Sequence, residues 1–529
     1  MINICVSYGR LAYAYRMSKR KSSSPPSDQN GKKVGRRSYT PISDALSQPN
    51  TLADNEFSEG IARFNLLSLL SQCMKKERRS DGVELVQILM TLLVWPVLNS
   101  SSIHCYCSEL CQYIWINAKK LRRPADVIYD FWAREDINWR KWACKVSRKV
   151  GDKINLGNPE KQAFIVDDTL KARRGKKVEG SSRHFDHNSG TSMQGHQVLE
   201  LGISGEAGFI PVDQHIYTGE CNAIGKAPDK DFKDGRSAAA QDMKRAVDEN
   251  KHQLLSGMIK RAIKAGHKAA YVLGDAWFGT KANIAMALEN GLKAIFQMKR
   301  GKLTYRFQGK QYTAHALHTK FERKMKASSK ARYKTVRIEA EINLETSSTA
   351  KPRWQLVVLI LSAPKEEIHD NWVIFLTTDT DASVEQILEI YALRWSIEVY
   401  FKEVKQNFGF LAEQSGKYQV AYASIHLAAV RYLLIFEAMQ RNGNISFGEQ
   451  RDLQSGKLLV MSYANLLWGL FRAIITGVFE QLEEEIGKEM IEKLTDGIDG
   501  AVDLILNDAL HMSSSQVREL QRAEAAGAI

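Results

Sequence analysis

Carboxylates that follow apolar, strand-like segments are the residues of this chain best suited to chemistry. Asp168 follows the apolar run 163–166, and Asp275 follows the apolar run 269–274. Side chains at the ends of neighbouring strands meet at the rim of an α/β sheet, where sites usually form. Two carboxylates that close repel unless a cation neutralises them, and Mg²⁺ and Mn²⁺ prefer oxygen ligands. The pair predicts a divalent-metal site, although an Asp at a strand end is more often a turn or cap residue.

A third carboxylate, Glu398, lies in a helix that we expect to run from about Ser383, its N-cap, to about Asn407. At about 100° per residue, four of its side chains fall within roughly a 60° arc of one face, with Lys402 beside them. On this face the carboxylate would ligate a metal, and the cations that flank it would hold phosphates. The same spacing also fits an exposed helix surface with i,i+4 ion pairs. The four residues are Tyr391, Arg394, Glu398 and Lys405.

This Tyr-x2-Arg-x3-Glu-x6-Lys spacing resembles the signature of DDE transposases of the insertion-sequence-four type. The resemblance also covers 166–169 and 272–278, around the two Asp residues, and extends from about residue 80 to about residue 440. Asp168 rather than Asp167 matches the family's first Asp, because that Asp directly precedes a Thr. The resemblance implies that the catalytic, metal-binding residues are Asp168, Asp275 and Glu398.

The resemblance implies an α/β fold, with a ribonuclease H-like catalytic core that carries a β-rich insertion. It implies cut-and-paste transposition, in which double-stranded DNA is cleaved at the element ends and the ends are transferred into target DNA. It also implies that two Mg²⁺ or Mn²⁺ ions per active site catalyse both steps. Bringing two ends together favours a homodimer, and the setting would be the nucleoid of a bacterial cytoplasm. A Trp beside the motif's Arg, like Trp395, accompanies hairpin release in family members. We expect DNA contacts from Tyr391, Arg394, Trp395, Lys402, Lys405, Lys171, Arg173 and Arg174.

The charge of the chain also favours a polyanionic partner. The 529 residues carry a formal net charge of +14, and Lys and Arg side chains neutralise phosphates and release counterions. A basic segment directly after Asp168 predicts phosphate contacts, although a solvated loop has the same composition. His184, Asp186 and His187 follow it, and their spacing favours loop polarity over a metal site. The basic residues are Lys171, Arg173, Arg174, Lys176, Lys177 and Arg183.

The seven cysteines form no disulfide framework in a chain of this length, which fits a reducing cytoplasm. His104, Cys105, Cys107 and Cys111 offer zinc ligands but lack a second ligand pair at usable spacing, so we expect them to pack in a core. We expect no membrane span. The apolar runs 83–98 and 458–479 contain polar or charged residues and are interpreted as buried helices.

Composition and periodicity predict several regions along the chain. The basic start could be a solvated leader or an arm that tracks DNA, and Met17 could be the true first residue. Strand-like segments at 163–166, 198–203, 208–217, 269–274 and 292–298, with a helical segment at 242–265, indicate an α/β core. Four more strand-like segments follow at 303–307, 333–342, 354–361 and 372–377. In order, we expect a disordered tail (1–55), a helical N-terminal DNA-binding domain (56–150), the catalytic core (160–300 and 381–412) interrupted by the β-rich insertion (301–380), a C-terminal helical region (413–510) and a frayed end (511–529).

Three other functions share some of these features. A metal-dependent nuclease or resolvase on the same core would cut DNA but not join it. An inactive DNA-binding descendant is expected to have lost a carboxylate, whereas all three are present. An acid/base hydrolase such as a glycosidase also uses two carboxylates, but the cations that flank Glu398 suit an anionic substrate. Inverted repeats in the DNA that flanks the gene would favour a transposase over a nuclease.

Overall fold

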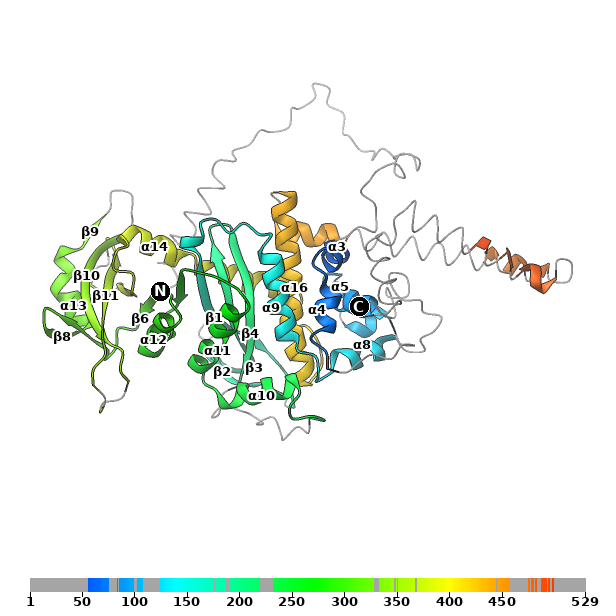
Figure 1. The fold of residues 1–529 in the computed structure, drawn as a ribbon, viewed down its shortest axis with the longest axis horizontal. Coiled ribbons are helices and arrows are strands. Elements are labelled where there is room, and N and C mark those ends of the chain that lie inside the picture. The colour runs from blue at the N-terminus through cyan, green and yellow to red at the C-terminus, as the bar shows by residue number, and fades with distance from the viewer. Residues whose placement is uncertain are drawn as a thin grey trace, which may run out of the picture. The chain divides into compact units, whose positions relative to one another are not determined.

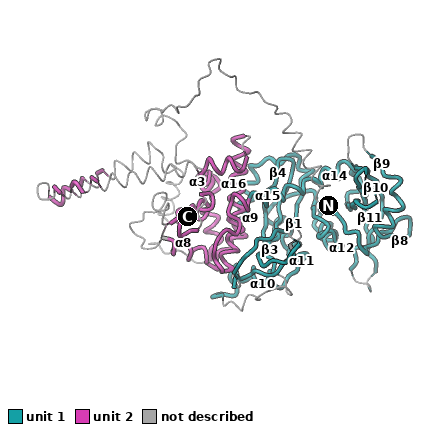
Figure 2. The backbone as a smooth tube through the Cα atoms, turned by 180° about the vertical axis from the view of Figure 1, so that it is seen from behind, with its two compact units in different colours: residues 1–21, 143–403 teal, residues 22–142, 404–529 magenta. Residues whose placement is uncertain are grey.

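The structure is a computed structural model, and the part that it describes falls into two compact units (Figure 2). Unit 1 contains Ala143–Glu403, and unit 2 contains the described residues up to Trp142 and from Val404 onward. The predictions for the two tails, for Cys111, Lys176 and His187 and for most of 458–479 lie outside the described residues. The described residues are 56–75, 83, 85–98, 102–107, 124–175, 177–186, 190–218, 232–327, 333–346, 349, 351–366, 369–443 and 446–455, with scattered positions from 474 to 498.

Within the described residues of unit 1, twelve strands form one mixed sheet (Figure 1). β3 pairs antiparallel with β1 and β4, whereas β1, β5 and β6 run parallel side by side. The first four residues of β1 are buried and apolar, and all of β5 is buried, which is typical of parallel strands covered on both faces. The first six strands are β1 (Ala163–Ala172), β2 (Ser182–Asp186), β3 (Thr191–Gly205), β4 (Gly208–Tyr217), β5 (Tyr271–Gly274) and β6 (Lys293–Met298).

The segment predicted to be β-rich, 301–380, continues this sheet, because β12 pairs antiparallel with β6. Its four predicted strands are all present, and the structure adds the short strands β8 and β9. The helix α13 (Ala314–Phe321) and the 3-10 turn η4 (Glu322–Lys324) connect β8 to β9. The strands are β7 (Thr304–Phe307), β8 (Lys310–Thr313), β9 (Lys326–Ala327), β10 (Tyr333–Asn343), β11 (Trp354–Pro364) and β12 (Val373–Thr377).

Two helices that we predicted to be continuous are broken. The expected helix 242–265 is instead α10 and α11, because Asn250 caps the start of α11 in a reciprocal capping box with Gln253. The expected helix 383–407 is α14 and α15, separated by Leu393 and Arg394. The helices here are α9 (Trp139–Gly151), η3 (Pro159–Lys161), α10 (Ala238–Asp248), α11 (Lys251–Lys264), α12 (Lys281–Glu289), α14 (Val384–Ala392) and α15 (Trp395–Gln406).

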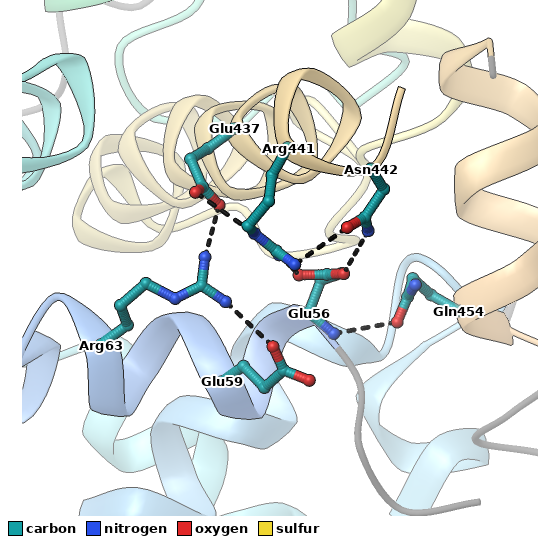
Figure 3. Close-up of polar contacts among 7 residues, drawn as sticks. All are labelled: Glu56, Glu59, Arg63, Glu437, Arg441, Asn442 and Gln454. Carbon is teal, nitrogen blue, oxygen red and sulfur yellow. Dashed lines mark hydrogen bonds and ion pairs between the residues drawn. The ribbon is translucent and has the colours of Figure 1, made fainter. Parts of the chain in front are cut away.

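Unit 2 is helical where it is described. The long helix α16 packs against α3, α5 and α8, so segments predicted as two separate helical regions share one unit. Figure 3 shows the polar contacts between α3 and α16, among them Arg63 with Glu437 at 2.7 Å and Arg441 with Glu56. The helices are α3 (Glu56–Arg63), α4 (Leu66–Ser71), α5 (Leu85–Val94), α6 (Ile103–Tyr106), α8 (Pro124–Trp132) and α16 (Tyr418–Asn442).

The helix α16 forms the core of unit 2. Among the described residues it is the one helix long and apolar enough to cross a membrane, but its apolar stretch is completely buried inside the structure, as in a core helix. Its buried Arg431 donates hydrogen bonds to the backbone carbonyls of Leu92, Leu93 and Phe408. These carbonyls lie at the end of α5 and after α15, so one guanidinium satisfies acceptors that the helix ends leave open.

Candidate active site

Two aspartates meet where β1 and β5 lie side by side. The parallel register pairs Phe164 with Val272 and Ile165 with Leu273. Two residues further along, this register sets Asp167 level with Asp275, the first residue after β5. Residues level in neighbouring strands project from the same face of a sheet. The two carboxylates are close enough for Asp275 to raise the pKa of Asp167.

Arg394 joins this pair to the carboxylate of Glu398. Its Nη1 lies 3.1 Å from Asp167 Oδ2, and its Nη2 donates a hydrogen bond to Glu398 Oε1. Arg394 lies in the break between α14 and α15, and Glu398 lies in the first turn of α15, where the helix dipole favours a negative charge. The guanidinium therefore supplies a positive charge between two carboxylates that would otherwise repel each other.

The environment of Asp167 favours its protonated form. Burial is the main reason that its pKa rises from an ordinary 3.8 to about 7, and the charges of Asp275 and Asp168 add to the rise while Arg394 opposes it. The side chain is 20% exposed, so a cation can still reach it. A divalent cation would compete with that proton for the carboxylate oxygens, which makes binding at this site dependent on pH.

Asp168 contacts a different part of unit 1, which corrects its predicted place in the site. Its Oδ2 lies 2.6 Å from Lys251 Nζ of α11, and its Oδ1 accepts a hydrogen bond of 2.7 Å from Gln197 of β3. Successive side chains of a strand point to opposite faces, so Asp167 and Asp168 project in opposite directions. The strand end expected at Asp168 is also wrong, because β1 continues to Ala172. The structure groups Asp167, and not Asp168, with Asp275 and Arg394.

The free carboxylate oxygens fit a hard divalent cation in chemistry, although a complete ligand set is not assembled. Asp275 Oδ1 accepts hydrogen bonds from the backbone amides of Trp277 and Phe278, at 2.9 and 3.3 Å. Within the described part of the chain, Asp275 Oδ2 and Glu398 Oε2 have no hydrogen-bond or ion-pair partner. No three Asp, Glu, His or Cys side chains of the described residues already form a metal-binding group. Oxygen donors of this kind are those that Mg²⁺ and Mn²⁺ prefer.

Residues 115–355 match the family model of the DDE superfamily endonucleases. This match supports a DDE transposase-type family, nuclease-type catalysis and a DNA substrate. The DDE-type nucleases generally use divalent metal ions. The mixed α/β architecture is consistent with such a nuclease fold. No curated protein matches the chain.

The DDE match includes Asp167 and Asp275 but ends before Glu398, so the third carboxylate depends on the helix motif and on its contact with Arg394. Of that motif, Tyr391 is buried, and its hydroxyl donates to Gly274 O at 3.4 Å. Because it is buried, Tyr391 is better placed to hold α14 against the end of β5 than to contact DNA as predicted.

The other predicted DNA contacts are partly exposed and stay predictions. Trp395 begins α15 and is half-buried, Lys402 is exposed, and Lys405 lies in the last turn of α15. The helix break changes their geometry, because Tyr391 and Arg394 no longer share one straight helix with Glu398.

The basic segment after Asp168 begins within β1 rather than in a loop. Lys171 is half-buried and Arg174 is exposed, so both can reach a ligand. Arg173 instead donates to His196 Nδ1 at 3.1 Å. The loop expected around His184 is the strand β2, and the His184 side chain is buried.

The sequence alone did not single out Lys251 or Trp277, which lie near the site. The ammonium of buried Lys251 lies 4.6 Å from the centroid of the Trp277 ring and 5.2 Å from that of Tyr217. His252 stacks on Trp277 with ring centroids 5.0 Å apart. Trp277 lies two residues after Asp275 in the sequence, and this closeness could have indicated that it belongs near the site. Lys251 had no comparable signal, because a Lys near a helix start is usually a surface residue.

Proposed function

We propose that this chain is a DDE transposase of the insertion-sequence-four type, which cuts the ends of a DNA element and joins them to target DNA. Asp167, Asp275 and Glu398 would be its catalytic carboxylates. The observation that carries this proposal is the bridge formed by Arg394 between Asp167 and Glu398, with Asp275 beside Asp167. Three carboxylates that can hold divalent cations, with Arg394 beside them, suit a phosphodiester better than a neutral substrate.

Each side chain has a distinct part in this proposal. Asp167 and Asp275 would hold Mg²⁺ or Mn²⁺ from the strand ends, and Glu398 would close the site from α15. Two such ions supply Lewis-acid activation of the attacking oxygen and neutralise the leaving oxygen. Arg394, released from one carboxylate, would donate its planar pair of N–H groups to a phosphate beside the scissile bond.

The strand order supports a ribonuclease H-like core within this proposal. Strands β4, β3, β1, β5 and β6 lie side by side, with β1, β5 and β6 parallel. The strands β7 to β12 would then form the β-rich insertion that precedes the helix carrying Glu398. A homodimer that brings two DNA ends together belongs to the same proposal, as does a bacterial nucleoid setting.

Strand transfer separates this proposal from a metal-dependent nuclease of the same family. The substrate is a duplex with the inverted repeat of the element, cut beforehand to leave a 3′-hydroxyl, mixed with plasmid and Mg²⁺ or Mn²⁺. We expect joined products with the wild-type chain and none with Glu398→Gln or with EDTA. A wild-type chain that cuts uncut ends but never joins the precut ones would make the nuclease the correct assignment. A chain that binds DNA without cutting it would be an inactive relic.

A further inference from the structure

Exposed cations gather at the end of the sheet formed by β8, α13 and β9. Between residues 310 and 326 there is one acidic residue, Glu322, which already contacts His318 and His369. None of the cations there makes an ion pair with a carboxylate in the described part of the chain. The exposed cations are Lys310, Lys320, Arg323, Lys324 and Lys326.

Three cations elsewhere in the sheet are paired with carboxylates. Arg306 binds Glu341 at 2.6 Å, and Lys293 binds Asp379 at 2.9 Å. Arg337 contacts Glu339 at 2.6 Å. These pairs contrast with the β8–β9 end, where five exposed cations make no ion pair with a carboxylate of the described residues.

Aromatic rings connect three of these lysines into one surface, called here the lysine–aromatic patch. Lys320 Nζ lies 5.3 Å from the ring of Phe307 and 4.8 Å from that of Tyr312. Phe307 contacts Phe321, and Lys324 Nζ lies 5.3 Å from the ring of Phe321. Lys310 is level with Phe307 in the β7–β8 ladder, on the same face. The patch consists of Lys310, Lys320, Lys324, Phe307, Tyr312 and Phe321.

The rings restrict the lysine stems and leave the ammonium groups in solvent. Ring contact favours a cation energetically, and side chains already held in place lose less entropy when they bind. Exposed ammonium groups, of which those of Lys320 and Lys324 lie against rings, suit a polyanion because none makes an ion pair with a carboxylate of the described residues. Duplex DNA, with one phosphate charge per ~1.7 Å of axis, has that character.

We propose that the lysine–aromatic patch binds the phosphate backbone of the same duplex DNA that the active site cuts. This inference rests on the proposed function. Figure 1 shows α13, β8 and β9 together at the end of the sheet, and β8 is seven strand positions from β1. At about 4.8 Å per strand, seven strand positions span ~34 Å across the sheet, which corresponds to ~10 base pairs. DNA must therefore extend about that far beyond the cleavage site to reach the patch.

The test compares two triple variants that each remove three exposed lysine charges. Lys310→Gln/Lys320→Gln/Lys324→Gln changes the patch. Its control, Lys260→Gln/Lys264→Gln/Lys268→Gln, changes exposed lysines in and after α11. Binding is measured in EDTA against salt concentration, with duplexes that extend ~5 or ~20 base pairs on either side of the cleavage site. Thermal unfolding checks that both variants fold.

We expect the patch variant to lose ~2.7 from the log–log salt slope on the long duplex, which is ~0.9 for each phosphate contact. On the short duplex it should bind like the wild-type chain, and the control should do so on both. An unchanged slope on the long duplex, an equal loss on the short one, or an equal loss in the control would overturn the proposal. Cleavage of the short duplex is scored separately, because its failure in the wild-type chain would contradict the proposed function instead.

Discussion

The two faces of strand β1 hold neighbouring aspartates in opposite electrostatic situations. On one face, Asp167 shares Arg394 with Glu398 and lies beside Asp275, so carboxylates outnumber cations. On the other face, Asp168 has its own cation, Lys251, and a hydrogen bond from Gln197. The first face has an excess of negative charge that a divalent cation can neutralise, whereas the second is already neutral. Identical side chains one residue apart therefore have different roles in the proposed function, Asp167 as a metal ligand and Asp168 as part of a structural ion pair.

Of the variants that test this comparison, Glu398→Gln should have the largest effect, which is on the rate of DNA cleavage. The change keeps the size of the side chain and a hydrogen-bonding oxygen for Arg394, but it removes a charge needed to bind the cations. Metal-ion stabilisation of the transition state is worth several kcal/mol, so cleavage should fall by about 1000-fold or more. End binding in EDTA should hold or improve. Cleavage at the wild-type rate would remove Glu398 from the site.

The second largest effect is expected from Asp167→Asn, which should change the free energy of unfolding by an amount that depends on pH. The pKa of Asp167 is raised to about 7, so the folded chain binds a proton that the unfolded chain has released above pH 3.8. The contribution of Asp167 to wild-type stability should therefore fall as the pH rises from about 4 to about 7, and then level off. In EDTA at pH 8, Asp167→Asn should unfold with a free energy up to about 4 kcal/mol larger than the wild-type chain. A stability difference between Asp167→Asn and the wild-type chain that is the same at pH 5 and at pH 8 would contradict this environment for Asp167.

Asp168→Asn should have the opposite effect, because it leaves the buried ammonium of Lys251 without its carboxylate. Loss of one partner of such a pair costs roughly 1–3 kcal/mol when the site is partly exposed. Asp168→Asn/Lys251→Met removes both charges and should recover most of that loss, as urea unfolding would measure. Asp168→Asn with unchanged stability would show that this ion pair does not hold α11 to β1.

The smallest effect is expected from Tyr391→Phe. The hydroxyl of Tyr391 makes two long hydrogen bonds, of 3.4 and 3.5 Å, to Gly274 O and Gln297 Oε1. Its loss should cost about 1 kcal/mol or less in the free energy of unfolding, with little change in DNA affinity. A clear loss of affinity with normal stability would restore Tyr391 as a DNA contact.

Much of the fold was readable from the sequence, because apolar runs predict buried strands. The predicted strands 163–166, 198–203, 208–217, 269–274 and 292–298 lie in β1, β3, β4, β5 and β6, although β1 continues six residues further and β3 begins seven residues earlier. The breaks before α11 and α15 were not predicted. The first depends on a reciprocal cap at Asn250, and the second coincides with an arginine whose partners include Asp167, more than 200 residues away in sequence.

The choice between Asp167 and Asp168 could not be made from the sequence for a physical reason. A strand with one solvated face alternates apolar and polar residues, which reveals the direction of each side chain. Residues 163–166 are all buried and apolar, so that alternation is missing. The direction of Asp167 follows from the register with β3 and β5, which pairs strands distant in sequence. Asp275 and Glu398 needed no such choice, because neither has an adjacent Asp or Glu.

Direct metal binding by a matched pair of variants tests the central claim, that Asp167 is the first metal-binding carboxylate. Mn²⁺ affinity is measured by electron paramagnetic resonance at pH 8 for the wild-type chain, for Asp167→Asn and for Asp168→Asn/Lys251→Met, which keeps that face of β1 neutral. We predict that Asp167→Asn loses at least about tenfold in affinity and that the double variant binds Mn²⁺ like the wild-type chain. Normal Mn²⁺ binding by Asp167→Asn, together with a loss in the double variant, would contradict the account.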